Sequence, residues 1–178
     1  MYPFIRLAWG TWRARQMPRL ANPLDTHISQ HRCLPWDIDM FAEMNNGRML
    51  SLYDLGRFQL AARAGLIDAL VKYGWALTIA GSSARYRKRI TTFKRFETRS
   101  RLVCWDERFM YLEQSMWVRG ECASHVLYRT AAIKNGKVVT PDRVAEALNV
   151  DGPPPAIPGW VKAWTEAEAQ RPWPPMQD

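Results

Sequence analysis

The chain has 178 residues, and 47% of them are hydrophobic, which is enough for one domain with a substantial core. Proline and glycine number 12 and 10, close to average usage, and this excludes a collagen-like or wholly disordered chain. The longest apolar stretch, residues 66–81, is interrupted by Asp68 and Lys72 and is too short to cross a membrane. Three widely spaced cysteines are typical of reduced thiols, so we expect a cytoplasmic protein.

The net charge of +8 is concentrated in two segments. Residues 85–101 carry eight basic residues against one acidic residue, and residues 1–20 carry four arginines and no acid. A concentrated basic patch indicates a phosphate-bearing partner, which could be nucleic acid, an anionic membrane surface or a phosphorylated cofactor. A solvated strand face is the alternative interpretation of the same pattern.

The first half of the chain predicts an arm, a short extended segment and a long helix. Residues 1–20 mix aromatic residues with arginines, as in an interfacial helix or an arm over a partner subunit. Residues 27–35 favour an extended segment, and a loop rich in Asp and Asn follows. Residues 47–64 are apolar around nearly the whole helix circumference, which indicates a buried helix that ends at Gly65.

The second half predicts antiparallel strands, with a short helical or irregular piece at 66–73 before them. Alternating patterns and turn residues place the strands at 75–90, 96–105, 109–118 and 121–134. A short helix from Thr140 to Leu148 and an amphipathic segment around Trp160 follow. One buried helix against a curved antiparallel sheet is an α+β pattern. We divide the chain into an N-terminal amphipathic arm, a main domain and a proline-rich segment with a short helix, at 1–26, 27–150 and 151–178.

The residues suited to chemistry lie in the loop before the long helix. Asp37, Asp39 and Glu43 gather there, and Asn45 and Asn46 are candidate caps of the helix. Free N–H groups at a helix start can stabilise negative charge that develops on a substrate oxygen, and a neighbouring carboxylate can act as nucleophile or general base. Ordinary turn and capping roles explain the same residue types. The histidines and cysteines show no metal-ligand spacing, so we expect no metal site.

The loop and the start of the helix resemble a known enzyme family. The segments PWDID at 35–39, MNNGRML at 44–50 and DLGR at 54–57 resemble the hot-dog thioesterases of the hydroxybenzoyl-CoA thioesterase class. The segments 84–89, 103–106 and 111–113 also resemble the branch that includes the vertebrate thioesterase superfamily members. The resemblance covers roughly residues 27–134.

The resemblance implies a hot-dog fold, in which an antiparallel sheet wraps around one long central helix. It implies an acyl-CoA thioesterase of lipid metabolism that hydrolyses fatty or aromatic acyl-CoA to free acid and coenzyme A. No further cofactor is needed, because coenzyme A is part of the substrate. The family also implies a homo-oligomer, a dimer or a tetramer, with active sites at the interface between protomers, and no nucleic-acid partner.

The resemblance assigns roles to individual residues. It makes Asp39 the nucleophile or general base, the backbone N–H of Asn46 the oxyanion donor, and Asn45 the residue that shapes the turn. Glu43 stands where the family frequently has histidine, and could share or take over the role of the base. Asp54 is a secondary candidate, because some members use a helix carboxylate; pairing with Arg57 or Ser51 one turn along the helix is the alternative.

The basic segment gains a specific role in this interpretation. We expect basic side chains to bind the phosphates of coenzyme A; these are Arg85, Arg87, Lys88 and Arg89. Ser82 and Ser83 could line the thioester end of the same strand, and a role in a turn or at the sheet edge is the alternative for both. Because Glu43 and Ala42 depart from the family pattern, a non-catalytic acyl-CoA or acyl-carrier binding protein is the second hypothesis. A peripheral membrane contact through residues 1–20, or a nucleic-acid contact, is the third.

Overall fold

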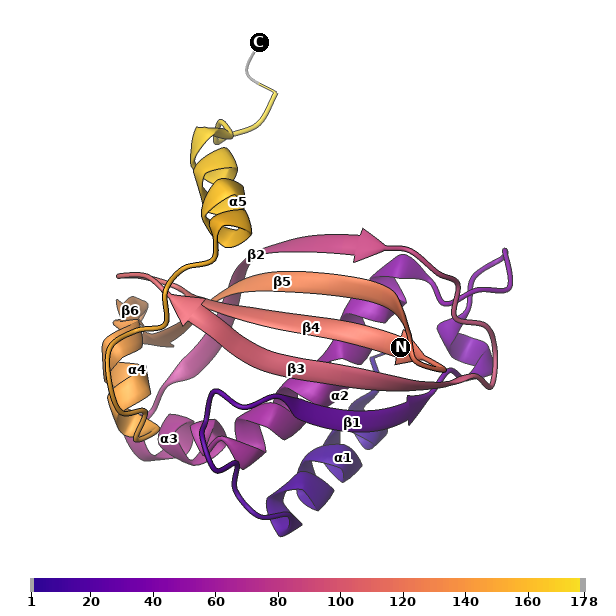
Figure 1. Ribbon diagram of the computed structural model, residues 1–178, viewed down its shortest axis with the longest axis horizontal. Helices are drawn as coiled ribbons and strands as arrows, with labels where there is room; N and C mark the ends of the chain where they lie inside the picture. The colour runs from indigo at the N-terminus through magenta and orange to yellow at the C-terminus, as the bar shows by residue number, and fades with distance from the viewer. Residues whose placement is uncertain (1, 177–178) are drawn as a thin grey trace.

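The computed structural model describes residues 2–176; residue 1 of the predicted arm and residues 177–178 of the predicted C-terminal segment lie outside them. An antiparallel sheet has the order β1-β3-β4-β5-β2, with β6 paired to β5. The strands are β1 His27–Arg32, β2 Ala76–Tyr86, β3 Arg95–Trp105, β4 Met110–Val118, β5 Glu121–Lys134 and β6 Lys137–Val139. This sheet curls around the central helix α2, Asn46–Arg63 (Figure 1). The predicted hot-dog fold is confirmed.

Local sequence signals define both ends of α2. The side chain of Asn45 caps the helix by accepting the N–H of Arg48 at 3.0 Å. At the other end, Gly65 has a φ of +86°, a left-handed conformation that favours glycine and stops the helix. In the middle of α2, Gly56 lets the helix approach the sheet, because a Cβ there would lie 2.7 Å from Cγ2 of Thr98 on β3.

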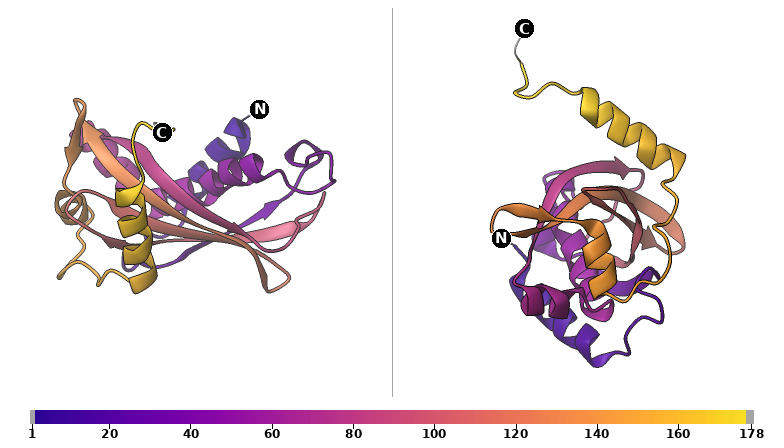
Figure 2. Two further views of the ribbon diagram at one scale, coloured as in Figure 1. Left: turned by 90° about the horizontal axis from the view of Figure 1, so that it is seen from above. Right: turned by 90° about the vertical axis from the view of Figure 1, so that its left-hand side faces the viewer.

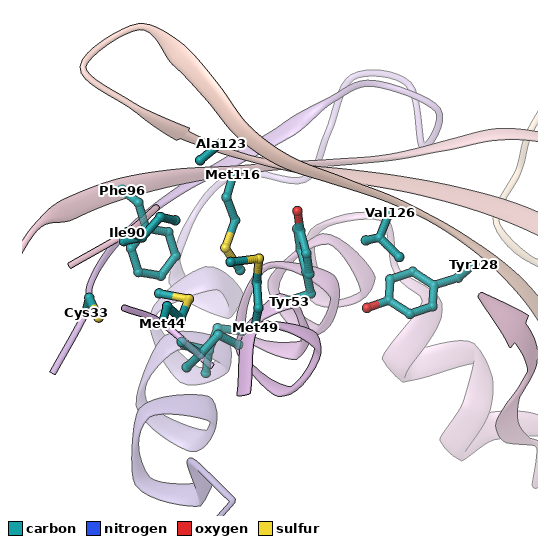
Figure 3. Packing of buried hydrophobic residues seen from close by; sticks show 12 residues of the cluster. Cys33, Met44, Met49, Tyr53, Ile90, Phe96, Met116, Ala123, Val126 and Tyr128 are labelled. Atoms are coloured by element: carbon teal, nitrogen blue, oxygen red, sulfur yellow. The ribbon is translucent and has the colours of Figure 1, made fainter. Parts of the chain in front are cut away.

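The main core lies between α2 and the inner face of the sheet (Figure 3). Met49 and Tyr53 point from the helix toward Met116 of β4 and neighbouring strand residues, and all three are at least 97% buried. The Tyr53 hydroxyl is hydrogen-bonded to Oγ of Ser124 at 2.7 Å, which satisfies the polar end of an otherwise apolar contact. Burial of each such apolar side chain contributes roughly 1.5–3 kcal/mol to the free energy of folding.

Further helices surround this unit. The arm forms α1, Phe4–Gln16, which lies along α2 on the outside of the molecule (Figures 1 and 2). α3, Leu66–Tyr73, follows α2, and α4, Pro141–Ala147, follows β6. α5, Gly159–Gln170, is held by the buried Val161 and by Trp164, which lies edge-on to Tyr111, and it projects away from the sheet (Figure 2).

The strand predicted at 75–90 is shorter than expected and ends at Tyr86. The N–H groups of Arg87 and Lys88 both donate to the carbonyl of Ala123, at 2.8 and 3.0 Å, so the chain turns out of the sheet. Ile90 then accepts the N–H of Met44 from the loop before α2. Residues 87–90 therefore do not occupy alternate strand positions, and the prediction of a strand there is wrong.

Candidate active site

Asp37 anchors the loop that precedes α2. Its carboxylate is fully buried and pairs with Arg6 at 2.8 Å and with Arg48 at 2.7 Å. The same carboxylate accepts the N–H of Leu34 at 3.0 Å, and the Asp37 carbonyl accepts the N–H of Asn45. Because this buried carboxylate is ion-paired with two arginines and also bonds the loop backbone, we assign Asp37 a structural role that separates it from the other two acids of the loop.

Asp39 lies half-buried in a small closed turn. Its Oδ1 accepts the N–H of Phe41 at 2.9 Å, and its own N–H donates to the carbonyl of Glu43 at 2.8 Å. Ala42 completes the turn with a φ of 58°, in the left-handed region. An antiparallel bridge between Ile38 and Met44, the residues that flank the turn, closes its base. Asp39 thus stands in a defined loop before the helix.

The start of α2 offers backbone donors next to this turn. Asn45 is the helix cap, and Asn46 is the first residue of the helix and is exposed. The first N–H groups of any helix lack an intrahelical acceptor and can donate to a substrate oxygen. Glu43 forms an ion pair with Nε of Arg89 at 2.8 Å, so a residue expected at the phosphates of coenzyme A instead pairs with a candidate base.

A large apolar cavity of about 320 Å³ opens between α2, α3 and the sheet. This volume has room for about ten water-sized groups. Aliphatic side chains dominate its wall, among them Leu60, Ile67, Leu70, Leu77, Ile79, Leu102, Leu112 and Val144. Of the residues predicted to be catalytic, Asp54 is the one that lines this cavity, and Arg57 and Tyr2 line it with Asp54.

These three polar residues form a linked group in the cavity wall. Asp54 forms an ion pair with Arg57 and accepts a hydrogen bond from the Tyr2 hydroxyl. Burial and the neighbouring Asp54 raise the pKa of Tyr2, so its hydroxyl remains a donor at neutral pH. The guanidinium of Arg57 lies 4.5 Å from the ring centre of Tyr128. Burial raises the pKa of Tyr128 to about 12.

Two polar atoms, one in this group and one beside it, are buried and form no hydrogen bond of standard geometry among residues 2–176. They are Nη1 of Arg57 and the hydroxyl of Tyr128. Buried polar atoms are usually hydrogen-bonded, and leaving one unsatisfied costs about 1–3 kcal/mol. The cavity therefore combines an apolar wall, suited to a hydrocarbon chain, with the polar side chains of Asp54, Arg57 and Tyr2 in that wall.

The residues predicted to bind coenzyme A are dispersed. Ser82, Ser83 and Arg85 are exposed on β2, and Arg87 is exposed just after it. Lys88 pairs with Glu121 of β5, while Arg89 pairs with Glu43. Arg89 thus contacts the predicted catalytic loop, whereas Lys88 contacts β5.

Comparison with known proteins identifies the family. Residues 33–165 match the family model of the thioesterase-like superfamily. The chain belongs to this superfamily. Protein THEM6 of Xenopus laevis is 34% identical over 166 residues, which cover 89% of this chain and 78% of that protein. Protein THEM6 of Drosophila melanogaster is 32% identical over 112 residues, covering 62% of this chain and 58% of that protein.

Solved structures show the same fold at low sequence identity. The probable thioesterase YbaW from Escherichia coli superposes with a TM-score of 0.64 and 17% identity, over 70% of this chain and 98% of that chain. The DHNA-CoA thioesterase from Staphylococcus aureus superposes with a TM-score of 0.61 and 15% identity, over 81% and 91% of the two chains. The predicted resemblance to hot-dog thioesterases is confirmed, and membership of the superfamily supports hydrolysis of a thioester.

Sequence reasoning missed two features of the site. It did not bring Tyr2 to Asp54, because 52 positions separate the two residues and no local pattern links them. It also grouped Asp37 with the candidate catalytic acids, although Arg6 and Arg48 bind this carboxylate. The spacing of Asp54 and Arg57 by three positions on a helix did indicate their pairing.

Proposed function

We propose that this protein is an acyl-CoA thioesterase that hydrolyses fatty or aromatic acyl-CoA to the free acid and coenzyme A. The observation that carries the proposal is the apolar cavity with carboxylate-bearing α2 in its wall. An acyl group would enter this cavity, where burial of each methylene is worth about 0.8 kcal/mol. The thioester would lie outside this cavity, at the start of α2 and beside the loop that carries Asp39.

In the proposed reaction, the N–H of Asn46 stabilises the oxyanion and Asp39 supplies the base. Asp39 takes a proton from water as the water oxygen adds to the thioester carbonyl carbon. The tetrahedral intermediate then collapses with cleavage of the C–S bond, and the coenzyme A sulfur leaves and takes up a proton. Direct attack by the Asp39 carboxylate, followed by hydrolysis of the anhydride, gives the same products.

Asp54 offers a second position for the catalytic carboxylate. It follows Asn46 by eight residues on α2, which corresponds to about 12 Å along the helix axis. A carbonyl bound to the Asn46 N–H is therefore too far from Asp54 of the same protomer for both groups to act on it. Catalysis by Asp54 would require the Asn46 N–H of a second protomer at the same carbonyl.

We propose a homodimer joined along β2. This strand is the edge of the sheet, and every residue in it except Gly81 is exposed. Leu77, Ile79 and Tyr86 expose 47, 45 and 38% of their surfaces there, and an open edge with apolar side chains favours pairing with another strand. Sedimentation analysis should show a dimer, and Ile79→Lys should shift it toward monomer. A monomeric wild type would refute this arrangement.

Within this arrangement, Arg85 and Arg87 would bind the phosphates of coenzyme A. Both side chains are exposed, whereas Lys88 and Arg89 already pair with acidic residues. The double variant Arg85→Gln/Arg87→Gln should raise KM for acyl-CoA with little change in kcat. Added salt should also raise the KM of the wild type, because dissolved ions screen these exposed charges.

The decisive test is release of free thiol from acyl-CoAs of graded chain length and from benzoyl-CoA. The wild type is compared with Asp39→Asn, Glu43→Gln and Asp54→Asn, and with Asp25→Asn at an exposed loop position as the control. Loss of at least about a hundredfold in Asp39→Asn alone would support the proposed base. If only Asp54→Asn loses activity, Asp54 on α2 is the catalytic carboxylate. If only Glu43→Gln loses activity, Glu43 is the catalytic carboxylate.

A non-catalytic acyl-CoA or acyl-carrier binding protein is the second candidate. The ion pair between Glu43 and Arg89 favours it, because an ion-paired carboxylate occupies the position where the resemblance leads us to expect histidine. Saturable binding of acyl-CoA by the wild type, without release of thiol from any substrate in the series, would establish this function and refute the enzyme.

A further inference from the structure

The outward face of α1 carries a cluster of large apolar side chains. Phe4, Ile5, Trp9 and Trp12 expose 68, 86, 59 and 54% of their surfaces. Ile5, Trp9 and Trp12 follow the spacing of a single helix face, and the two indole rings stack with their centres 5.1 Å apart. Contiguous exposed apolar patches of this kind mark interaction sites, whereas isolated exposed apolar residues are ordinary.

The opposite face of α1 holds the helix in place. Arg6 donates to the Asp37 carboxylate and to the carbonyl of Arg32, both at 2.8 Å. Ala14 is buried, and Gly10 brings the helix so close to α2 that an added Cβ would lie 2.7 Å from Nε2 of Gln59. The helix therefore cannot roll to bury its tryptophans against its own domain, and Figure 2 shows it on the outside of the molecule.

The charges around the apolar face are basic. Residues 1–20 contain four arginines and no acid, and α1 has Arg13 and Arg15 in its last turn. Arg13 is exposed, and Arg15 and Arg19 lie near Asp68 of α3. Tryptophan, phenylalanine and isoleucine beside arginine form the pattern of a helix that lies in the interface of an anionic bilayer. Two copies of this positively charged face would repel each other.

We propose that the outward face of α1 docks on the surface of an anionic lipid bilayer, with the helix lying parallel to the membrane plane. The 13 residues of α1 present a face about 20 Å long, along which the apolar side chains enter the headgroup region and Arg13 meets lipid phosphate. Among the helices of residues 2–176, none is long and apolar enough to cross a membrane. The proposal concerns binding alone and does not depend on the thioesterase activity.

The test uses the full chain and vesicles of phosphatidylcholine with or without phosphatidylglycerol. Co-sedimentation should show binding to the vesicles that contain phosphatidylglycerol, with a blue shift of tryptophan fluorescence, and added NaCl should weaken binding. Trp9→Ala/Trp12→Ala should weaken partitioning roughly tenfold or more. Trp173→Ala, which changes a tryptophan that is 88% exposed outside α1, serves as the control and should bind normally.

Two further variants separate membrane docking from a loss of folding. Ile5→Gln removes the most exposed side chain of the face and should weaken binding, while Arg13→Gln should reduce the dependence on phosphatidylglycerol and on salt. Circular dichroism reports whether each variant is folded. The proposal fails if the wild type does not bind these vesicles, or if the control loses as much binding as the double variant. It also fails if the folded α1 variants bind vesicles normally and change only the oligomeric state, since a second copy would then cover this face.

Discussion

Replacing Asp37 by asparagine should destabilise the protein strongly, although the change removes no volume. The carboxylate is fully buried and bridges Arg6 and Arg48, whose side chains are 22% and 12% exposed. Asparagine can still accept a hydrogen bond from one arginine, but it no longer neutralises either guanidinium. The side chain at position 37 would then offer no negative charge to either of these largely buried arginines.

The magnitude follows from the burial of these partners. Removing one member of a buried ion pair costs about 3–5 kcal/mol, because the other member stays charged and desolvated. Arg6 lowers this cost, since it keeps its bond to the Arg32 carbonyl and some contact with solvent. We therefore expect Asp37→Asn to reduce the free energy of unfolding by about 3 kcal/mol, which corresponds to roughly 6–12 °C in Tm.

Urea denaturation followed by circular dichroism measures this loss. Glu107→Gln, at an exposed position in the turn between β3 and β4, is the charge-matched control and should leave the free energy of unfolding unchanged. The double variant Asp37→Asn/Arg6→Gln should lose less than the sum of the two single variants, because both remove the same contact. A loss below about 0.5 kcal/mol in Asp37→Asn would refute the anchoring role.

Three further predictions concern the core and the response to pH. Gly56→Ala should lower the free energy of unfolding in urea by about 1–3 kcal/mol, because its Cβ would lie 2.7 Å from a Thr98 methyl group; Gly159→Ala, where a Cβ meets nothing within 4 Å, should not. Tyr53→Phe should cost about 1–2 kcal/mol in the same assay by removing the buried bond to the Ser124 hydroxyl, and an unchanged value would contradict that bond's contribution. Burial lowers the pKa of His31 from 6.5 to about 4, so protons bind preferentially to the unfolded chain between these values. The free energy of unfolding should therefore fall by about 1–2 kcal/mol from pH 7 to pH 5, and His31→Gln should flatten this part of the profile; an equal slope in wild type and variant would contradict the prediction.

Elements whose signals are local were predicted well. The helix expected at 47–64 is α2, Asn46–Arg63, because the Asn45 cap, the apolar pattern and Gly65 all act within a few residues. The strand expected at 121–134 coincides with β5, Glu121–Lys134, which is bounded by the turn residues Arg119–Gly120 and Asn135–Gly136. By contrast, β2 ends at Tyr86 because Arg87 and Lys88 donate to the distant carbonyl of Ala123, a contact that no local pattern encodes.

The same division holds for the candidate site. Local turn and capping residues predicted the loop that holds Asp39 and the start of the helix near Asn46, because these residues lie next to one another in the chain; the catalytic roles given to them come from the family resemblance. Only the tertiary structure showed that Asp37 is a buried anchor, that Asp54 reaches a cavity beside Tyr2, and that Arg89 forms an ion pair with Glu43. Residue type and spacing determine local backbone structure, but packing decides which distant charges lose their water and must therefore be paired.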